Sequence, residues 1–267
     1  MSETNHTPQD LCDALLSTIE NDIIPLTRTA VASGSKVFGA AILDIRTLQV
    51  LTVATNDERA SPLLHGEVNC IQKFFTESFP LPSASASAST SSSTPSSSTS
   101  VSAATPSSSP TSVPGRPSPS ADCIFLATHE PCSLCLSAIA WSGFTRVYHL
   151  FTHDDSRRLF AIPHDIDILQ QVFRVRSEAS SETEDQLARR PLYNRRNRFF
   201  TAMSIDELAA TAAATAPPAR TSTPTATSAA PDGLTTRINA IKQMYSSLDR
   251  TYQDAKASGV ATSSIWK

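Results

Sequence analysis

Residues 128–135 read Thr-His-Glu-Pro-Cys-Ser-Leu-Cys, and residues 65–67 read His-Gly-Glu. Cys132 and Cys135 are three positions apart, so a helix that starts here places both thiols on one face of its first turn. The positive end of the helix dipole lowers the pKa of a thiol and favours the thiolate that binds metal. A catalytic zinc site takes three protein ligands and leaves the fourth position to water. With His65 as the third ligand, the two stretches predict one zinc ion per chain.

Glu67 lies two residues after His65 and is not needed as a ligand, which leaves its carboxylate free to carry protons. Zinc lowers the pKa of a bound water toward neutrality, and a nearby carboxylate can take the proton as a general base. The order His-x-Glu and then Pro-Cys-x-x-Cys resembles the signature of zinc nucleobase deaminases. This resemblance implies that the hydroxide attacks a ring carbon bearing an amino group, and that Glu67 then delivers protons to the ring nitrogen and to the departing ammonia.

The Cys-x-x-Cys pair alone has three other interpretations: a structural zinc site, a redox motif, and two cysteines of a hydrophobic core. A structural site with two cysteines and two histidines needs a second histidine at short spacing, and His65 has none. A thioredoxin-like motif needs a surrounding fold pattern that the sequence does not show. The His-x-Glu motif upstream therefore favours the catalytic interpretation.

The flanking sequence predicts alternating helices and strands. Residues 7–10 form a helix start, with a hydroxyl cap and proline at the first helical position, and the apolar stripe behind it ends near Gly34. Another helix is expected from Pro131, between two strands, and this order predicts a right-handed parallel crossover. Short apolar runs predict strands at residues 37–43, 50–54, 123–127 and 147–151.

Two tracts, residues 82–120 and 211–232, consist almost entirely of Ser, Thr, Ala and Pro. They lack periodicity and apolar side chains to bury, so folding could not offset the entropy of ordering them. We therefore expect a disordered insertion at 82–120 and a low-complexity linker at 211–232. Residues 233–257 carry apolar side chains at helical spacing, which predicts an amphipathic C-terminal helix.

These motifs resemble those of the cytidine deaminase-like superfamily, in its CMP/dCMP-type zinc-binding branch. That branch includes cytosine deaminase, bacterial-type guanine deaminase and tRNA adenosine deaminase. The resemblance covers residues 11–175 without the insertion. The separation between His65 and Cys132, 132 − 65 = 67 residues, exceeds the usual spacing, and deleting residues 82–120 restores a normal one. The matching motifs are Phe38-Gly39-Ala40, Asn56, His65-x-Glu67 and Glu130-Pro131-Cys132-x-x-Cys135.

The resemblance implies an α/β/α sandwich around a five-stranded mixed sheet, with zinc between the helices that start at His65 and Pro131. The deaminase domain would span residues 7–81 and 121–210. The implied reaction is zinc-dependent hydrolysis of an amino-substituted nucleobase, nucleoside or nucleotide to its keto form, with release of ammonia. The superfamily also implies a homo-oligomer such as a dimer.

Five residues are candidates for contact with the substrate. Asn56 matches the family Asn that hydrogen-bonds the substrate, and a simple turn residue is the alternative. Gly66 stands where the family usually has Ala, and its backbone N–H could face the base. Phe38 and Trp141 are candidates for stacking on the base or for the core, and they favour guanine deaminase and tRNA adenosine deaminase over cytosine deaminase. Asn194 is a candidate lid residue.

Residues 189–200 combine arginines with aromatic side chains. Such a segment can bind phosphate and stack bases, which would suit tRNA. A charged turn with Phe199 and Phe200 buried is the alternative. Segments beyond the core often close the pocket in this superfamily, which gives a set of candidate lid residues: Tyr193, Asn194, Asn197 and Phe199.

The composition gives information on binding partners and on the location of the protein in the cell. The formal net charge of −3 gives no sign of a general nucleic-acid or membrane surface, and no stretch is long and apolar enough to span a bilayer. Five cysteines, an odd number, suit reduced thiols better than disulfides. Together with an N-terminus that lacks a targeting pattern, this predicts a cytoplasmic protein, with the nucleus as an alternative.

The leading hypothesis is a zinc-dependent deaminase of a small nucleobase, nucleoside or nucleotide. One alternative is a tRNA adenosine deaminase subunit. The other is a catalytically silent, zinc-stabilised scaffold of the same fold, and the presence of Glu67 argues against it.

Overall fold

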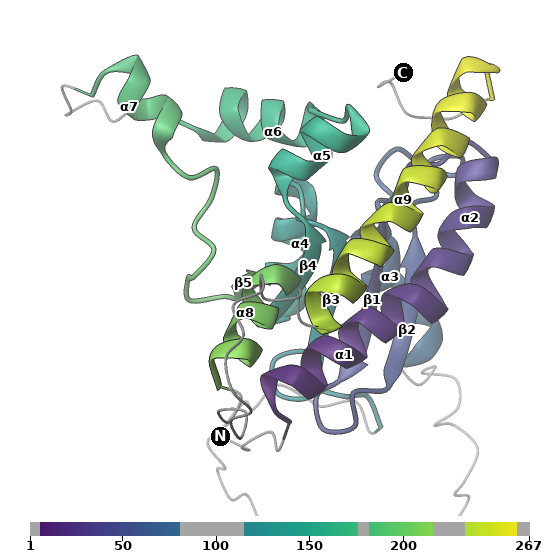
Figure 1. Ribbon diagram of the computed structural model, residues 1–267, viewed down its shortest axis with the longest axis vertical. Coiled ribbons are helices and arrows are strands. Elements are labelled where there is room, and N and C mark those ends of the chain that lie inside the picture. Colours follow the sequence, from purple (N-terminus) through teal and green to yellow (C-terminus); the bar gives the residue numbers. More distant parts are fainter. Residues whose placement is uncertain (1–5, 81–114, 176–181, 216–232, 261–267) are drawn as a thin grey trace, which may run out of the picture.

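The computed structural model describes residues 6–80, 115–175, 182–215 and 233–260 (Figure 1). Most of the expected insertion and linker therefore lies outside the described residues. At the linker's start, helix α8 (Ile205–Thr215) continues to Thr215, five residues into the range 211–232. Among the described residues, no helix is long and apolar enough to cross a membrane.

A five-stranded mixed sheet forms the centre of the molecule, as predicted. Its strands lie in the order β2-β1-β3-β4-β5. Strand β1 pairs antiparallel with β2 and β3, whereas β4 pairs parallel with β3 and β5. The strands are β1 (Gly39–Asp44), β2 (Val50–Thr55), β3 (Cys123–His129), β4 (Arg146–Phe151) and β5 (Thr201–Ser204).

Helices cover both faces of the sheet. On one face lie α1 (Pro8–Thr18), the π-helical turn η1 (Ile19–Ile23), α2 (Ile24–Ala32), α8 and α9 (Gly233–Ala257). In Figure 1, α1 and α2 follow each other end to end, and α9 runs beside them in front of the strands. On the other face lie α3 (Gly66–Lys73), the π-helical turn η2 (Phe74–Ser78) and α4 (Ser133–Ser142).

The central strands are apolar on both sides because each face is covered. In β3, Leu126 belongs to the core under α1, α2 and α9, and its neighbour Phe125 belongs to the core under α3 and α4. Every residue of β3 is buried. The continuous apolar run of the sequence is therefore a fully enclosed strand, which fixes the position of the residues that follow it.

The N-terminal helix begins as the sequence predicts. Thr7 and Asp10 form a reciprocal capping box around Pro8. The helix then runs through η1 directly before Pro25, whose missing N–H interrupts the regular hydrogen-bond ladder. Gly34, with φ +90°, lies just beyond its end.

Helix α9 is fastened to this N-terminal helix by Arg237. The guanidinium contacts the carboxylates of Asp13 and Glu20 at 3.2 Å and 2.5 Å, and donates to the Ser17 hydroxyl at 2.8 Å. Buried apolar residues of α9, such as Tyr245, enter the core. The C-terminal helix is therefore an integral part of the fold.

Four short helical segments stand at one end of the sheet, and they are α5 (His153–Phe160), α6 (His164–Ile168), the π-helical turn η4 (Leu169–Phe173) and α7 (Glu184–Arg189). Figure 1 shows α7 at the tip of an arm that extends away from the sheet. The chain then returns to form β5, a strand that the sequence patterns did not predict.

Candidate active site

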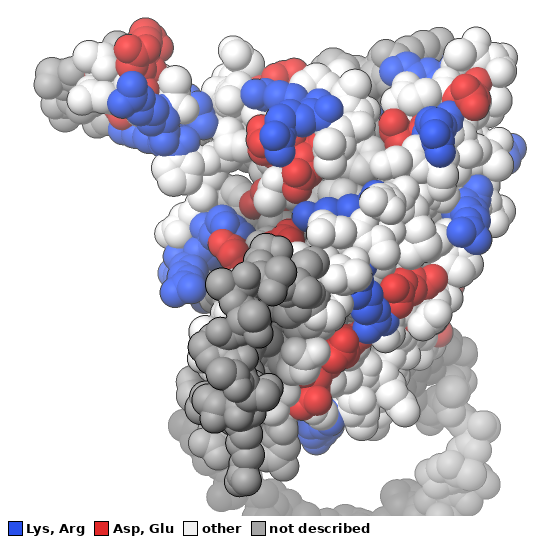
Figure 2. Space-filling view, in the orientation of Figure 1, with Lys and Arg blue, Asp and Glu red and all other residues white. Residues whose placement is uncertain are grey.

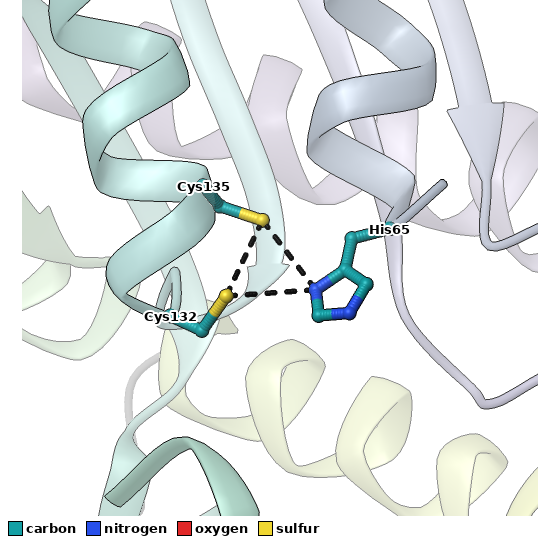
Figure 3. Close-up of side chains that lie close together, drawn as sticks. All are labelled: His65, Cys132 and Cys135. Carbon is teal, nitrogen blue, oxygen red and sulfur yellow. Dashed lines mark hydrogen bonds between the residues drawn. The ribbon is translucent and has the colours of Figure 1, made fainter. Parts of the chain in front are cut away.

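The three predicted zinc ligands meet at the starts of two helices. His65 directly precedes α3, Cys132 directly precedes α4, and Cys135 lies in the first turn of α4. Figure 3 shows the two sulfurs and the imidazole pointing toward one another. The Sγ atoms are 3.6 Å apart, and Nδ1 of His65 lies 3.5 Å from Sγ of Cys132 and 3.6 Å from Sγ of Cys135.

These distances suit a tetrahedral zinc ion. Zn–S bonds of about 2.3 Å and a Zn–N bond of about 2.0–2.1 Å place tetrahedral ligand atoms roughly 3.5–3.8 Å apart. The three ligand atoms all lie within 4.8 Å of one another, and no other group of three such residues in the described part of the chain does so. The cluster is therefore compatible with one zinc ion, and three protein ligands leave a fourth position.

The environment of Cys132 favours its thiolate, whereas burial raises the pKa of Cys135 above its usual range. A hydrogen bond from Cys135 and the nearby His65 outweigh burial and hold the pKa of Cys132 well below its usual range. Burial lowers the pKa of His65, but the Cys132 thiolate outweighs this effect and raises the pKa to about 9. The thiolate is the form of cysteine that binds metal.

Glu67 lies in the first turn of α3, two residues after His65, and only 5% of its surface is exposed. Burial and the nearby Cys132 thiolate raise the pKa of Glu67 to about 7. It is not one of the three clustered ligands. A buried carboxyl group with a pKa near neutrality can both accept and release a proton.

A cavity of about 390 Å³ opens beside this cluster. Phe38 forms part of its wall, with its ring edge against His129 at a centroid distance of 4.5 Å, so it contributes to both the cavity and the core. A buried ion pair between Lys36 and Glu58 forms another part of the wall. Ser133 and His164 also line the cavity, and apolar side chains form much of the rest: Pro62, Leu63, Leu134, Ile162 and Ile168.

Asp165, from the start of α6, also lines the cavity, and sequence analysis did not select it. Burial and the Cys132 thiolate raise the pKa of Asp165 to about 7. Nothing in the local sequence distinguishes it from Asp154, Asp155 and Asp167, which lie on the same helical segments. Only the folded arrangement of α6 beside α4 brings this carboxyl group to the zinc cluster.

Asn56 is buried beside the ligand His65, but its carbonyl oxygen is already used. Oδ1 of Asn56 accepts the backbone N–H of Gly66 at 2.6 Å. Its amide nitrogen Nδ2 is buried and has no partner among the described residues. In this structure the Gly66 N–H, which was expected to face a base, therefore donates to Asn56.

Gly66 is glycine for a steric reason. A Cβ atom at this position would lie 2.8 Å from Cα of Gly39 and 3.0 Å from the carbonyl oxygen of Phe38. Real Cβ atoms essentially never come this close to backbone atoms, so the start of α3 can approach β1 only without a side chain.

Two residues predicted to contact the substrate lie away from the cavity. Trp141 lies on α4 with 92% of its surface exposed, so it is part of neither the cavity nor the core. Asn194 lines a separate, open groove together with Tyr193 and Arg196, and its Oδ1 accepts the backbone N–H of Arg196 at 3.1 Å. Neither side chain lines the cavity beside the zinc cluster.

Residues 23–151, which include every residue of the cluster and Glu67, match the family model of the cytidine and deoxycytidylate deaminase zinc-binding region. The chain carries a zinc-binding deaminase domain of this family. The family assigned from the sequence motifs is therefore confirmed. Asp165 and the segment 189–200 lie outside the matched region.

Two solved guanine deaminases are similar to the chain. One, from Bacillus subtilis, is 21% identical, with coverage of 62% of this chain and 84% of that chain and a TM-score of 0.36. Another, from Nitrosomonas europaea, is 13% identical, with coverage of 79% and 86% and a TM-score of 0.34. Both scores are too low to bear on the substrate of this chain. No curated protein sequence matches it.

Removal of one thiol tests the metal site. The variant Cys132→Ala loses one of three ligands, so its zinc content is expected to fall from about one ion per chain to near zero. Elemental analysis of the purified protein measures this. Cys70→Ala is the matched control, because Cys70 is a buried thiol of α3 outside the cluster. Full zinc content in Cys132→Ala would contradict the assignment.

Proposed function

We propose that the protein is a zinc-dependent hydrolytic deaminase of a free nucleobase or nucleoside. One observation carries the proposal: the clustered His65, Cys132 and Cys135 lie beside the buried carboxyl group of Glu67. Three ligands with an open fourth position suit a catalytic zinc ion, and a fourth protein ligand would suit a structural one. The net reaction consumes water, replaces the amino group by a carbonyl oxygen and releases ammonia.

Zinc, when bound, supplies a water molecule whose pKa is lowered toward neutrality. Glu67 would take one proton from the water as its oxygen bonds to the ring carbon, and would pass it to the adjacent ring nitrogen. It would then move the remaining proton of the added hydroxyl to the amino nitrogen, so that the C–N bond breaks, ammonia leaves and the carbonyl forms. A carboxyl group with a pKa of about 7 suits both directions of transfer at neutral pH.

The cavity lining favours a flat, weakly charged substrate. Phe38 and the apolar side chains can cover the faces of a ring. Asp165 offers carboxyl oxygens that can accept N–H groups from the edge of a base. Asn56 lines a different pocket, so its predicted contact with the substrate stays a prediction.

Charge argues against a nucleotide phosphate in the cavity. Three carboxyl groups, those of Glu58, Glu67 and Asp165, lie in or beside it. Lys36 is the lysine of the lining, and it is paired with Glu58. A phosphate would therefore meet more negative than positive charge, so we propose a free base or a nucleoside.

The tRNA alternative rests on the segment 189–200. Basic side chains gather along the chain that links α7 to β5, at the left of Figure 2. However, Arg195 is paired with Glu207, and Phe200 is buried, as the charged-turn interpretation expects. Phe199, in contrast, is 49% exposed. No observation at the cavity favours RNA over a small substrate.

The homo-oligomer implied by the family resemblance, such as a dimer, stays a prediction.

The variant Glu67→Gln keeps the size of the side chain and loses the proton carrier. Ammonia release is expected to fall by about 10²- to 10⁴-fold, the usual contribution of general acid–base catalysis. The assay uses cytosine, guanine, adenine and their nucleosides, with zinc content measured in parallel. Unchanged turnover by a zinc-loaded Glu67→Gln variant would contradict this role. Absence of turnover by the zinc-loaded wild type on every substrate would support the scaffold alternative.

The variant Asp165→Asn tests recognition of the base. Loss of a charge-assisted hydrogen bond is expected to lower kcat/KM by about 10- to 100-fold for the best substrate, while the zinc content is retained. Asp167→Asn is the matched control on the same helix, because Asp167 is exposed and does not line the cavity. Equal effects of the two substitutions would remove Asp165 from the substrate site.

A further inference from the structure

We propose that Tyr193 and His153 are positioning residues of the zinc site, which act by holding the two residues that directly precede Cys132. The inference rests on the proposed zinc site and is independent of the proposed substrate. It gives a role to part of the segment 189–200, which lies outside the region matched by the deaminase family.

Glu130 is the centre of this arrangement. It follows the last residue of β3, lies two residues before Cys132, and is only 9% exposed. Its backbone N–H donates to the carbonyl oxygen of Phe151 at 2.7 Å, which continues the pairing of β3 with β4. A buried carboxylate must be hydrogen-bonded, since an unpartnered one is costly. The partners of Glu130 therefore determine the position of residues 130–132, which we call the zinc loop.

Each carboxylate oxygen of Glu130 has a different partner. Oε1 accepts the hydroxyl of Tyr193 at 2.8 Å. Oε2 accepts the backbone N–H of His153 at 2.9 Å. One partner comes from the start of α5 and the other from the segment that leads to β5, so the carboxylate joins two parts of the chain to the zinc loop.

The His153 side chain contacts the same loop a second time. Its Nε2 lies 3.2 Å from the carbonyl oxygen of Pro131. A carbonyl oxygen can only accept, so Nε2 carries the proton. The Pro131 carbonyl belongs to the peptide group that continues into Cys132. His153 thus holds both residues before the first cysteine ligand.

Tyr193 is presented by an ordered turn. Next to it, Arg195 makes two hydrogen bonds to the carboxylate of Glu207 in α8, at 3.0 Å and 2.7 Å. The Asn197 side chain accepts the backbone N–H groups of Phe199 and Phe200 and donates to the carbonyl oxygen of Asn194. These contacts fix the turn to the body of the protein, so the Tyr193 hydroxyl can position Glu130.

The same segment divides into inward and outward side chains. Tyr193 and Arg195 are partly buried and turn toward Glu130, whereas Arg196 and Arg198 are exposed. The functional part of the motif is therefore the tyrosine, with Arg195 as its anchor. Partners outside the ligand set that orient a metal loop typically change metal affinity by about 10- to 100-fold when they are removed.

The decisive variant is Tyr193→Phe, which removes the hydroxyl and keeps the ring. Metal-free protein is titrated with Zn²⁺ in competition with a chromophoric chelator. We expect a dissociation constant that is about 10- to 100-fold weaker than that of the wild type. Tyr148→Phe is the matched control, because Tyr148 is a partly buried tyrosine of β4 that does not contact the zinc loop, and its affinity should be unchanged. Wild-type zinc affinity in Tyr193→Phe would overturn the proposal.

A double-mutant cycle separates positioning from a general loss of stability. If Tyr193 acts through Glu130, then Tyr193→Phe has little further effect on zinc affinity in a Glu130→Ala background, which has no acceptor for the hydroxyl. Additive losses would show that Tyr193 acts by another route and would also overturn the proposal. The absorption spectrum of the Co²⁺-loaded variants provides a second readout, since a displaced Cys132 ligand changes the thiolate bands without reference to activity.

Discussion

Three metal ligands must converge from two helix starts that lie 67 residues apart in the chain. The convergence depends on how closely α3 approaches β1, and Gly66 permits this because any Cβ would collide with the backbone at Gly39. It also depends on β3, which is buried along its whole length and carries the chain directly into the cysteine loop. The helix starts contribute unpaired N–H groups and the positive ends of two dipoles, which stabilise thiolates and carboxylates. The positions of the metal ligands therefore depend directly on how the sheet is packed.

The sequence was sufficient to predict the cluster of His65, Cys132 and Cys135 and four of the five strands, because these depend on local spacing and on continuous apolar runs. The sequence did not predict the position of residues whose surroundings are set by the tertiary structure. Trp141 follows an apolar stretch of α4 with no clear polar face, so the sequence could not show that this side chain is exposed. Strand β5 has only four residues, too few for a pattern. Asp165 reaches the cavity from a five-residue helix that carries other aspartates as well.

The chemistry and the surroundings of the site come from different parts of the chain. The matched deaminase region supplies the metal ligands and Glu67. Segments outside it supply Asp165 at the cavity and Tyr193 at the zinc loop. Helix α9 is held by Arg237 and places Tyr245 against His129, next to Glu130. The additional segments thus enclose a site whose reactive groups lie within the family region, and substrate choice is expected to depend on them.

X-ray absorption at the zinc edge of the purified protein tests the central claim most directly, because it reports the atoms bound to the metal. The account predicts two sulfur ligands at about 2.3 Å, one imidazole nitrogen at about 2.0–2.1 Å and one further oxygen from water. If the Cys135→Ala variant has one sulfur ligand fewer, then the measured zinc ion is the one bound by this cluster. A shell of four protein ligands without oxygen would describe a closed structural site, and it would contradict the catalytic role proposed for this zinc centre.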